Sequence, residues 1–203
     1  MRYPKLRELK EAVISLVTPA YTTKFPKKQH VPYENFRGKP EVDENYCVGC
    51  LTCVNVCPSN AITYTDDAEK KLRVIIRDYG KCIFCGQCEA NCITNKGVKL
   101  SNKIYDLTVF DRNQLIEKQE KELLPCNHCN AIITTKEHFH HMHNKLGPKS
   151  YASIISLNIL NERLKLAPEE EVTVDIKDDL KRKDMFNILC PNCNRKVQLK
   201  NLT

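Results

Sequence analysis

The 203-residue sequence has no run of about 18 consecutive apolar residues, the length that a membrane-spanning helix needs. Its first residues, MRYPKLRELKEAV, also lack the uninterrupted apolar stretch of a secretory signal peptide. We therefore expect a cytosolic chain that does not cross a membrane by itself. One residue type is abundant, because the sequence has twelve cysteines. In the cytosol stable disulfides are rare, and clustered thiols usually bind metal.

Two segments carry the same cysteine spacing. The first reads CVGCLTCVNVCP from residue 47, and the second reads CIFCGQCEANCI from residue 82. Each cysteine of the first segment, from Cys47 to Cys57, has a counterpart 35 positions later, from Cys82 to Cys92. The sequence therefore contains an internal repeat, and its spacing is that of ligands to a 4Fe-4S cube.

The fourth cysteine of each segment is predicted to serve the other segment's cluster. A cube needs one thiolate at each of four iron corners, and cysteines at i, i+3 and i+6 can wrap a compact loop around three of them. The fourth starts a segment that leads away, and in two-cluster ferredoxins it ligates the other cube. The predicted ligands are Cys47, Cys50, Cys53 and Cys92 for cluster 1, and Cys82, Cys85, Cys88 and Cys57 for cluster 2.

Zinc is the alternative metal for these eight cysteines. Zinc sites use paired C-x-x-C knuckles separated by longer loops, and not three cysteines at two successive three-residue steps. Pro58 follows Cys57 and constrains the turn there, whereas Ile93 leaves the second turn freer. The spacing therefore favours two 4Fe-4S clusters over zinc.

The residues between the ligands are mostly apolar, so we expect a sheath that keeps water away from the sulfurs. They are Val48, Leu51, Val54, Val56, Ile83, Phe84 and Ile93. No acid, base or nucleophile adjoins the segments in sequence. We therefore expect electron transfer without breakage of a substrate bond, and no enzymatic activity of the chain by itself.

The four remaining cysteines form two C-x-x-C knuckles. Cys126 and Cys129 pair with Cys190 and Cys193 as a tetrahedral four-thiolate site for one zinc ion or a rubredoxin-type iron. Asn130 and Asn194 follow the knuckles, and we expect positive φ at both, because asparagine tolerates it.

A rival site uses the first knuckle with two histidines of the segment HFHHMH. The candidates are His138, His140, His141 and His143. The spacing is close to that of a zinc finger, but this arrangement leaves CPNC at residue 190 unexplained. We expect the histidines to form a solvated helix face, with His128 a bystander inside the first knuckle.

The flanking segments suggest mixed secondary structure. Residues 4–18 have helical spacing with Leu6, Leu9, Val13, Leu16 and Val17 on one face, either packed on the chain's own domain or docked on a partner or membrane subunit. An extended arm should follow between Pro19 and Pro40, which hold four of the ten prolines. ITYT and LRVIIR, at 62–65 and 72–77, predict a hairpin inserted between the repeats.

The C-terminal half of the sequence has weaker patterns for secondary structure. Residues 98–110 look strand-like, and Asp111 could cap a polar helix over 112–124. A further helix is expected over 149–166, whereas 169–184 is highly charged and should be solvated.

The formal net charge of +7 treats every thiol as neutral. A cluster or a zinc ion held by four thiolates carries about −2, so three such sites would bring the total to about +1. The basic surplus is therefore weak evidence for an anionic partner, and we expect no nucleic acid. The remote alternative, a zinc-dependent nucleic-acid-binding module, predicts no cluster absorbance and salt-sensitive binding.

With these motifs, the sequence resembles the polyferredoxin-type subunit of formate hydrogenlyase and related membrane-bound nickel-iron hydrogenases, which is itself similar to the ferredoxin-like subunit of respiratory complex I. The resemblance rests on NFRGKP at 35–40, the two cysteine segments, CNHCN and CPNCN, and it covers most of the chain from about residue 20. Complex I subunits lack the four-cysteine tail, which favours the hydrogenlyase branch, and Ile93 departs from the family's usual proline.

The resemblance implies a relay of electrons between a donor module and the hydrogenase small subunit, on the cytoplasmic face of a membrane arm. The donor could be formate dehydrogenase, a ferredoxin or a similar iron-sulfur subunit. The alternative is the equivalent subunit of a complex I-like or other dehydrogenase complex.

The expected fold is α+β, a bacterial-type two-cluster ferredoxin with added parts. Residues 1–36 would form the N-terminal helix and docking arm, and residues 37–110 the ferredoxin domain. Residues 111–203 would form a helix and a small zinc-ribbon or rubredoxin-like unit.

Overall fold

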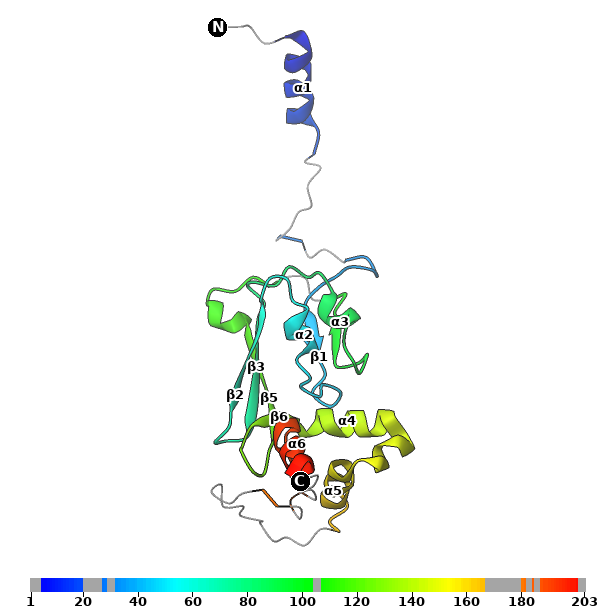
Figure 1. The fold of residues 1–203 in the computed structure, drawn as a ribbon. Helices are drawn as coiled ribbons and strands as arrows, with labels where there is room; N and C mark the ends of the chain where they lie inside the picture. Colours follow the sequence, from blue (N-terminus) through cyan, green and yellow to red (C-terminus); the bar gives the residue numbers. More distant parts are fainter. Residues whose placement is uncertain are drawn as a thin grey trace. The chain divides into compact units, whose positions relative to one another are not determined.

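The computed structural model describes residues 5–19, 27–28, 32–103, 107–166, 180–181, 184 and 187–200 (Figure 1). The chain divides into two units, Met1–Phe36 and Arg37–Thr203, which are described separately below. Most of the predicted arm between Pro19 and Pro40 lies outside the described residues, and so does most of the charged segment 169–184. In the described ranges, no helix has the length and apolar character that a bilayer crossing requires.

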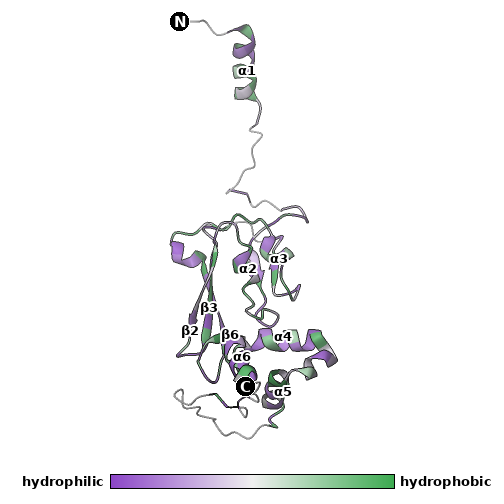
Figure 2. Cartoon of the chain, in the orientation of Figure 1, coloured by the Kyte–Doolittle hydropathy of each residue, from purple (hydrophilic) through white to green (hydrophobic). Residues whose placement is uncertain are grey.

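The first unit contains one helix, α1, at Leu6–Val17. Its start is fixed by the Glu8 carboxylate, which accepts a hydrogen bond of 3.1 Å from the backbone N–H of Lys5. The predicted helix is confirmed, and it ends just before Pro19. None of its residues is buried, and the apolar residues along it, visible in Figure 2, are exposed; Leu6 and Leu16 are 87% and 86% exposed.

The second unit is built on two antiparallel sheets. Strands β1 (Pro40–Val42) and β4 (Val98–Leu100) form a two-stranded sheet that joins the two ends of the repeat region. The larger sheet has the order β2-β3-β5-β6. The predicted hairpin is confirmed as β2 (Ile62–Asp67) and β3 (Leu72–Asp78), which pair antiparallel from Ile62 opposite Arg77 to Asp67 opposite Leu72.

Most of the polar segment 112–124 forms a strand, so the helix predicted over it is wrong. Asp111 does cap a turn, since its side chain accepts from the N–H of Asn113, but that turn is the short 3-10 helix η1 (Arg112–Leu115). Strand β5 (Ile116–Pro125) follows and pairs with β3. Its buried positions alternate through Gln119, Lys121 and Leu123, and because two of the three are polar, the period of two was hidden in the sequence.

The C-terminal elements pack around strand β6 (Ile132–Thr135), which pairs with β5. Helix α4 (Lys136–Leu146) leads into the 3-10 helix η2 (Gly147–Ala152) and helix α5 (Ile154–Arg163). The helix predicted over 149–166 is therefore interrupted at Ser153. The strand expected over 98–110 extends only through β4, and residues 104–106 lie outside the described part.

Two apolar clusters form the core of this C-terminal part. One contains Cys126, Leu180, Leu189, Cys190, Cys193 and Val197, and the other contains Leu124, Ile159 and Ile188. Ile133 of β6 packs against both clusters. Strand β3, in the segment predicted as the ferredoxin domain, pairs with β5, in the segment predicted as the C-terminal unit.

Candidate metal centres

Both cysteine segments form the same unusual backbone turn. Three pairs of residues 35 positions apart have positive φ: Gly49 and Phe84 at 68° and 53°, Leu51 and Gly86 at 64° and 79°, and Asn60 and Asn95 at 48° and 57°. Residues other than glycine pay about 1–2 kcal/mol for this conformation. Turns of this kind let successive backbone N–H groups converge into a concave site that favours negative charge. The repeat thus builds two loops whose backbone conformation suits an anionic group.

Each loop leads into a helix of one turn before the fourth cysteine. Helix α2 (Thr52–Asn55) follows Leu51, and helix α3 (Gln87–Ala90) follows Gly86. The helices carry the chain away from its own loop, so that the fourth cysteine reaches the other site.

The eight cysteines line two hollows in the predicted crosswise sets. One hollow is lined by Cys82, Cys85 and Cys88 together with Cys57 from the first repeat. The other is lined by Cys47, Cys50 and Cys53 together with Cys92 from the second repeat. Cys88 lines both hollows, so the two sites adjoin each other. The structure thus brings together the thiols that the spacing predicts to share a cluster, while the ligand assignment itself stays a prediction.

Hydroxyl groups approach three of the sulfurs. The Ser59 hydroxyl lies 3.7 Å from Sγ of Cys57, and the Thr94 hydroxyl lies 3.3 Å from Sγ of Cys92. Ser59 and Thr94 occupy equivalent positions in the repeat. A third hydroxyl, that of Thr52, lies 3.3 Å from Sγ of Cys50. Donors to sulfur stabilise its anionic form, so this geometry favours thiolates.

The two fourth cysteines share the same pKa pattern. Burial raises the pKa of the Cys57 thiol, but hydrogen bonds from Ser59 and from nearby backbone N–H groups outweigh burial and lower it overall. Burial likewise raises the pKa of Cys92, and hydrogen bonds from the Thr94 hydroxyl and from backbone N–H groups lower it overall. The thiols of Cys57 and Cys92 therefore favour the thiolate form, which is the form that binds a metal.

Three other cysteines of the repeat have the opposite shift in pKa. Burial raises the pKa of the Cys53 thiol to about 11, and the positive charge of Arg77 offsets part of this rise. Burial also raises the pKa of Cys82 and Cys88. A bound metal centre would supply the positive charge that keeps such buried thiols deprotonated.

Arg77 provides an independent test of whether these hollows suit an anionic cluster. Its side chain is 3% exposed and lines the hollow of Cys57 and Cys82. One guanidinium nitrogen donates a 3.1 Å hydrogen bond to Oε1 of Gln119, whereas Nε and Nη1 have no hydrogen-bond partner among the described residues. Burying such a cation is costly unless a negative group compensates it. An iron-sulfur cluster with four thiolates is such a group, so the residues present fit two 4Fe-4S clusters.

The four remaining cysteines form a compact third site. The sulfurs of Cys126, Cys129, Cys190 and Cys193 lie within 4.8 Å of one another, and those of Cys129 and Cys190 are 3.6 Å apart. Zinc–sulfur bonds of about 2.3 Å in a tetrahedron imply sulfur separations of about 3.8 Å. The site therefore suits a single tetrahedral ion.

Backbone groups already favour anionic sulfur in this site. The N–H of Cys190 donates to Sγ of Cys126 at 3.2 Å, and the N–H of Cys193 donates to Sγ of Cys190 at 3.5 Å. Burial raises the pKa of Cys126, but backbone hydrogen bonds outweigh it and lower this pKa to about 7. Burial raises the pKa of Cys193, as expected when several thiols crowd one point.

The knuckles differ from each other, which corrects two expectations. Asn130 has φ of 55°, as predicted, and follows the knuckle on the β5–β6 turn. Asn194, however, lies within helix α6 (Pro191–Lys200), so the prediction of positive φ at this residue is wrong. A helix at the second knuckle also departs from the expected ribbon, in which both knuckles would be turns.

The histidines lie on α4, as predicted, but they are only partly exposed to solvent. His138, His140, His141 and His143 are all half-buried, and the Thr134 hydroxyl lies 2.7 Å from Nδ1 of His138. Burial lowers the pKa of His138, with the charges of His141 and Arg73 adding to the effect. Among the described residues no histidine joins the four cysteines in a ligand group, so the zinc-finger rival is not formed.

Several site residues were missed in the sequence. Arg73 and Arg77 lie on the buried face of β3 beside Ile75, and Lys121 and Thr135 reach the sites from β5 and β6. The hydroxyls of Ser59 and Thr94 could have been found, because they recur at the repeat distance. The apolar sheath is incomplete, since Ile83 is 62% exposed.

Comparison with known proteins gives a consistent result. A family model described as a 4Fe-4S dicluster domain matches residues 28–96, which include all eight cysteines of the repeat. The chain is 35% identical over 99 residues to the NAD(P)H-quinone oxidoreductase subunit I of Gloeobacter violaceus, covering 46% of each protein. It is 38% identical over 120 residues to formate hydrogenlyase subunit 6 of Escherichia coli, covering 59% of this chain and 66% of that protein.

A third relative is matched over a larger share of its length. The NADH-quinone oxidoreductase subunit I 1 of Koribacter versatilis is 32% identical over 105 residues, which cover 47% of this chain and 68% of that protein. Among solved structures, a chain of the membrane-bound sulfane sulfur reductase, an archaeal respiratory membrane complex, matches with 26% identity and a TM-score of 0.38. That match covers 57% of this chain and 61% of the other. The chain thus spans about half to two thirds of the first relatives it matches.

Proposed function

From the premise that the chain belongs to the family of 4Fe-4S iron-sulfur subunits that includes NADH-quinone oxidoreductase subunit I and formate hydrogenlyase subunit 6, we propose that it relays electrons within a larger oxidoreductase complex. The observation that carries this proposal is that two adjoining hollows are each lined by three cysteines of one repeat and the fourth cysteine of the other, with Cys88 lining both. Adjoining redox sites suit a relay, and no substrate bond needs to be broken.

The proposed ligands are those of the repeat, with each fourth cysteine crossing to the other site. Bound 4Fe-4S clusters would supply one-electron chemistry at potentials set by hydrogen bonds, charge and solvent exposure. The chain's own contribution is to tune them. The hydroxyls of Thr52, Ser59 and Thr94 approach three of the sulfurs, and the buried Arg77 offers a positive charge.

For the C-terminal site we propose a structural zinc ion held by Cys126, Cys129, Cys190 and Cys193. Three of these residues are buried in an apolar cluster, and Cys129 is exposed. A closed site of four thiolates has no open position for substrate, which is typical of structural zinc. A rubredoxin-type iron is the alternative, and it would add a further redox stop.

The proposed partners are a hydrogenase small subunit and an electron-donor iron-sulfur subunit of a membrane-bound nickel-iron hydrogenase complex. The match to formate hydrogenlyase subunit 6 and the four-cysteine tail support this branch. The matches to NADH-quinone oxidoreductase subunits support the second candidate, a complex I-like dehydrogenase. For both candidates we propose that the chain lies peripherally on the cytoplasmic face of a membrane arm.

Anaerobic purification of the tagged full chain from its own cells tests the proposal. Recovery of a nickel-containing hydrogenase, with formate dehydrogenase or another donor, would support the first candidate. Recovery of NADH-oxidising chains would support the second. A chain that is purified alone, after gentle solubilisation of the membranes, would contradict the role as a subunit.

A further inference from the structure

The two cysteine loops are related by the repeat but differ in their surroundings. In the first loop, the Thr135 hydroxyl of β6 donates a 2.5 Å hydrogen bond to the carbonyl of Val48. Nζ of Lys121 on β5 donates to the carbonyl of Glu44 at 3.0 Å. Gly49 is buried, and a Cβ added there would lie 3.0 Å from Cγ2 of Thr135. The C-terminal part of the chain therefore covers the first loop.

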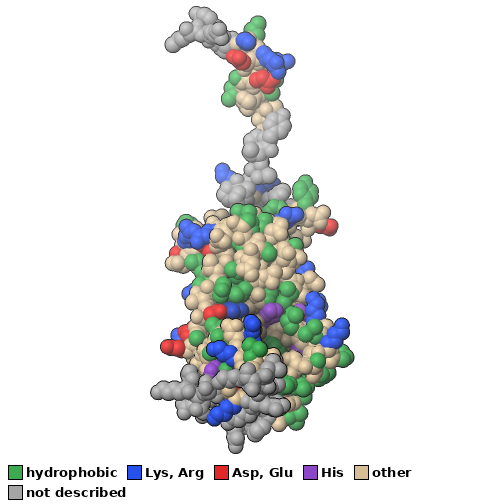
Figure 3. Space-filling model, viewed as in Figure 1, with side chains coloured by type: hydrophobic (Ala, Val, Ile, Leu, Met, Phe, Trp, Pro, Cys, Tyr) green, Lys and Arg blue, Asp and Glu red, His purple; other side chains and the backbone are tan. Residues whose placement is uncertain are grey.

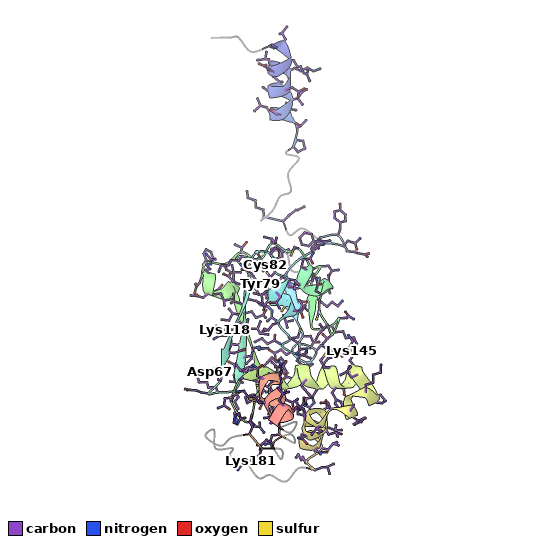
Figure 4. The ribbon with its side chains drawn as sticks, viewed as in Figure 1. Asp67, Tyr79, Cys82, Lys118, Lys145 and Lys181 are labelled. Atoms are coloured by element: carbon purple, nitrogen blue, oxygen red, sulfur yellow. The ribbon has the colours of Figure 1, made fainter. Side chains whose placement is uncertain are left out.

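The equivalent second loop, residues 82–86, is open. Ile83 is the counterpart of Val48, and it is 62% exposed whereas Val48 is half-buried. Phe84 is the counterpart of the buried Gly49, and it is only half-buried. Cys82 and Tyr79 lie close together just beyond the end of β3, at this loop (Figure 4). An exposed apolar side chain directly beside a ligand cysteine gives a partner close access to cluster 2.

Basic side chains stand around the second loop. Arg37 is exposed, and its guanidinium donates a 3.3 Å hydrogen bond to the carbonyl of Cys85. Lys81 precedes the loop directly and is exposed. Nζ of Lys39 lies 4.4 Å from the ring centroid of Tyr79. Figure 3 shows few charged side chains over α2 and α3 themselves, so the charge is concentrated at the edges of this face.

Two acidic residues lie in the same region, but they do not reverse its sign. Asp78 has its carboxylate 3.7 Å from Lys81 and 3.5 Å from Arg112. Glu117 accepts a hydrogen bond from the Tyr79 hydroxyl. Arg37, Lys39, Lys81 and Arg112 outnumber Asp78 and Glu117, and the buried Arg77 offsets part of the charge of about −2 that a cluster held by four thiolates would add. An apolar centre with a basic rim is complementary to a partner with an acidic rim.

We propose that residues 82–86 and this basic rim are the docking face for an acidic iron-sulfur protein that exchanges electrons with cluster 2. The inference rests on the proposed function. It specifies that the external partner meets cluster 2 and not cluster 1, and that this partner is acidic. In each transfer one electron leaves the reduced partner and enters this chain, and no bond forms or breaks. The electron would then pass from cluster 2 to cluster 1, whose loop is held by the chain's own C-terminal part, and from cluster 1 to the next subunit of the complex.

The test measures electron transfer from a reduced, small, acidic two-cluster ferredoxin to the full-length, cluster-loaded chain. Stopped-flow rates are compared for the unsubstituted chain and for Lys81→Glu, with Arg112→Glu as a second variant at the same rim. Lys70→Glu is a matched control. Lys70 lies 3.8 Å from Asp67, three residues earlier in the chain, just as Lys81 pairs with Asp78, but Lys70 is at the hairpin turn and not at the rim. We expect each rim variant to lower the bimolecular rate about tenfold at low ionic strength, and Lys70→Glu to leave it unchanged.

Two further measurements distinguish failure of the docking face from failure of the proposed function: the salt dependence of the ferredoxin rate, and reduction by dithionite. The rate for the unsubstituted chain should fall as salt rises, because screening weakens charge steering. Reduction by dithionite should be equal in all variants, which shows that both clusters are present and reducible. Equal ferredoxin rates in all variants, with dithionite reduction intact, would overturn the docking face but leave the relay standing. A chain that never acquires reducible clusters would overturn the proposed function itself.

Discussion

At the residue scale, the crossing of the fourth cysteines makes the two halves of the repeat depend on each other. Cys57 belongs to the first segment, but it lines the hollow of Cys82, Cys85 and Cys88. A substitution at one segment should therefore damage the cluster that is held mainly by the other. This dependence distinguishes a two-cluster ferredoxin from two independent metal knuckles.

Cys57→Ser should damage cluster 2, since a hydroxyl is a poorer ligand for iron than a thiolate. Its electron paramagnetic resonance spectrum after reduction should match that of Cys85→Ser. The spectrum of Cys92→Ser should instead match that of Cys50→Ser, because both affect cluster 1. If Cys57→Ser matched Cys50→Ser, the crosswise assignment would be wrong. Iron analysis checks that about four of eight iron atoms are affected in each case.

Arg77 makes a second prediction at this scale. Its buried positive charge should stabilise the reduced, more negative state of a nearby cluster, so Arg77→Met should lower the reduction potential. We expect at least a tenfold drop in the one-electron reduction constant, which corresponds to about 59 mV. A redox titration followed by electron paramagnetic resonance measures the shift.

Lys118 on β5 is exposed. Lys118→Met removes one positive charge from the surface and serves as the control for Arg77→Met. Its potential should stay close to that of the unsubstituted chain, since solvent screens the exposed charge. Equal shifts in Arg77→Met and Lys118→Met would mean that burial of Arg77 has no special effect on the cluster.

At the element scale, β6 connects the third metal site to the first cluster loop. The strand begins just after the knuckle of Cys126 and Cys129, and it ends at Thr135, which is fully buried against Val48. A metal held at the knuckle would therefore fix the strand that covers the loop. On the proposed function, the four-cysteine tail would brace the loop that holds cluster 1.

Thr135→Val should loosen the first loop, because it removes the hydroxyl and leaves the carbonyl of Val48 without this donor. The cost should be about 1–3 kcal/mol, and cluster 1 should be lost faster than cluster 2 when air is admitted. Thr135→Ser keeps the hydroxyl and should restore much of the lifetime. Thr134→Val, which removes the contact to His138 only, is the control. Equal lifetimes of both clusters in Thr135→Val would refute the brace.

The sequence predicted some elements well and others poorly, for physical reasons. The β2–β3 hairpin was predictable, because β-branched residues flank a polar turn. Strand β5 was not, because Gln119 and Lys121 face inward toward Arg77 and Glu44 and so give no apolar alternation. The histidines of α4 were expected in solvent, but the tertiary packing half-buries them, and this cannot be read from helical spacing alone.

At the scale of the whole molecule, the chain combines a symmetric repeat with an asymmetric addition. The repeat was fully visible in the cysteine spacing, and the turns repeat at the same distance down to their positive φ values. The addition breaks this symmetry, since it covers one loop and leaves the other open. That difference depends on the pairing of β3 with β5 and on the position of Thr135, which the spacing of cysteines does not encode.

The central claim is that the twelve cysteines hold two 4Fe-4S clusters and one further ion. Iron, acid-labile sulfide and zinc per chain, measured on anaerobically purified full-length protein, test it most directly. We predict about eight iron, eight sulfide and one zinc; about nine iron without zinc would make the third site a rubredoxin-type iron. Zinc as the main metal, without sulfide, in protein never exposed to oxygen would contradict the account.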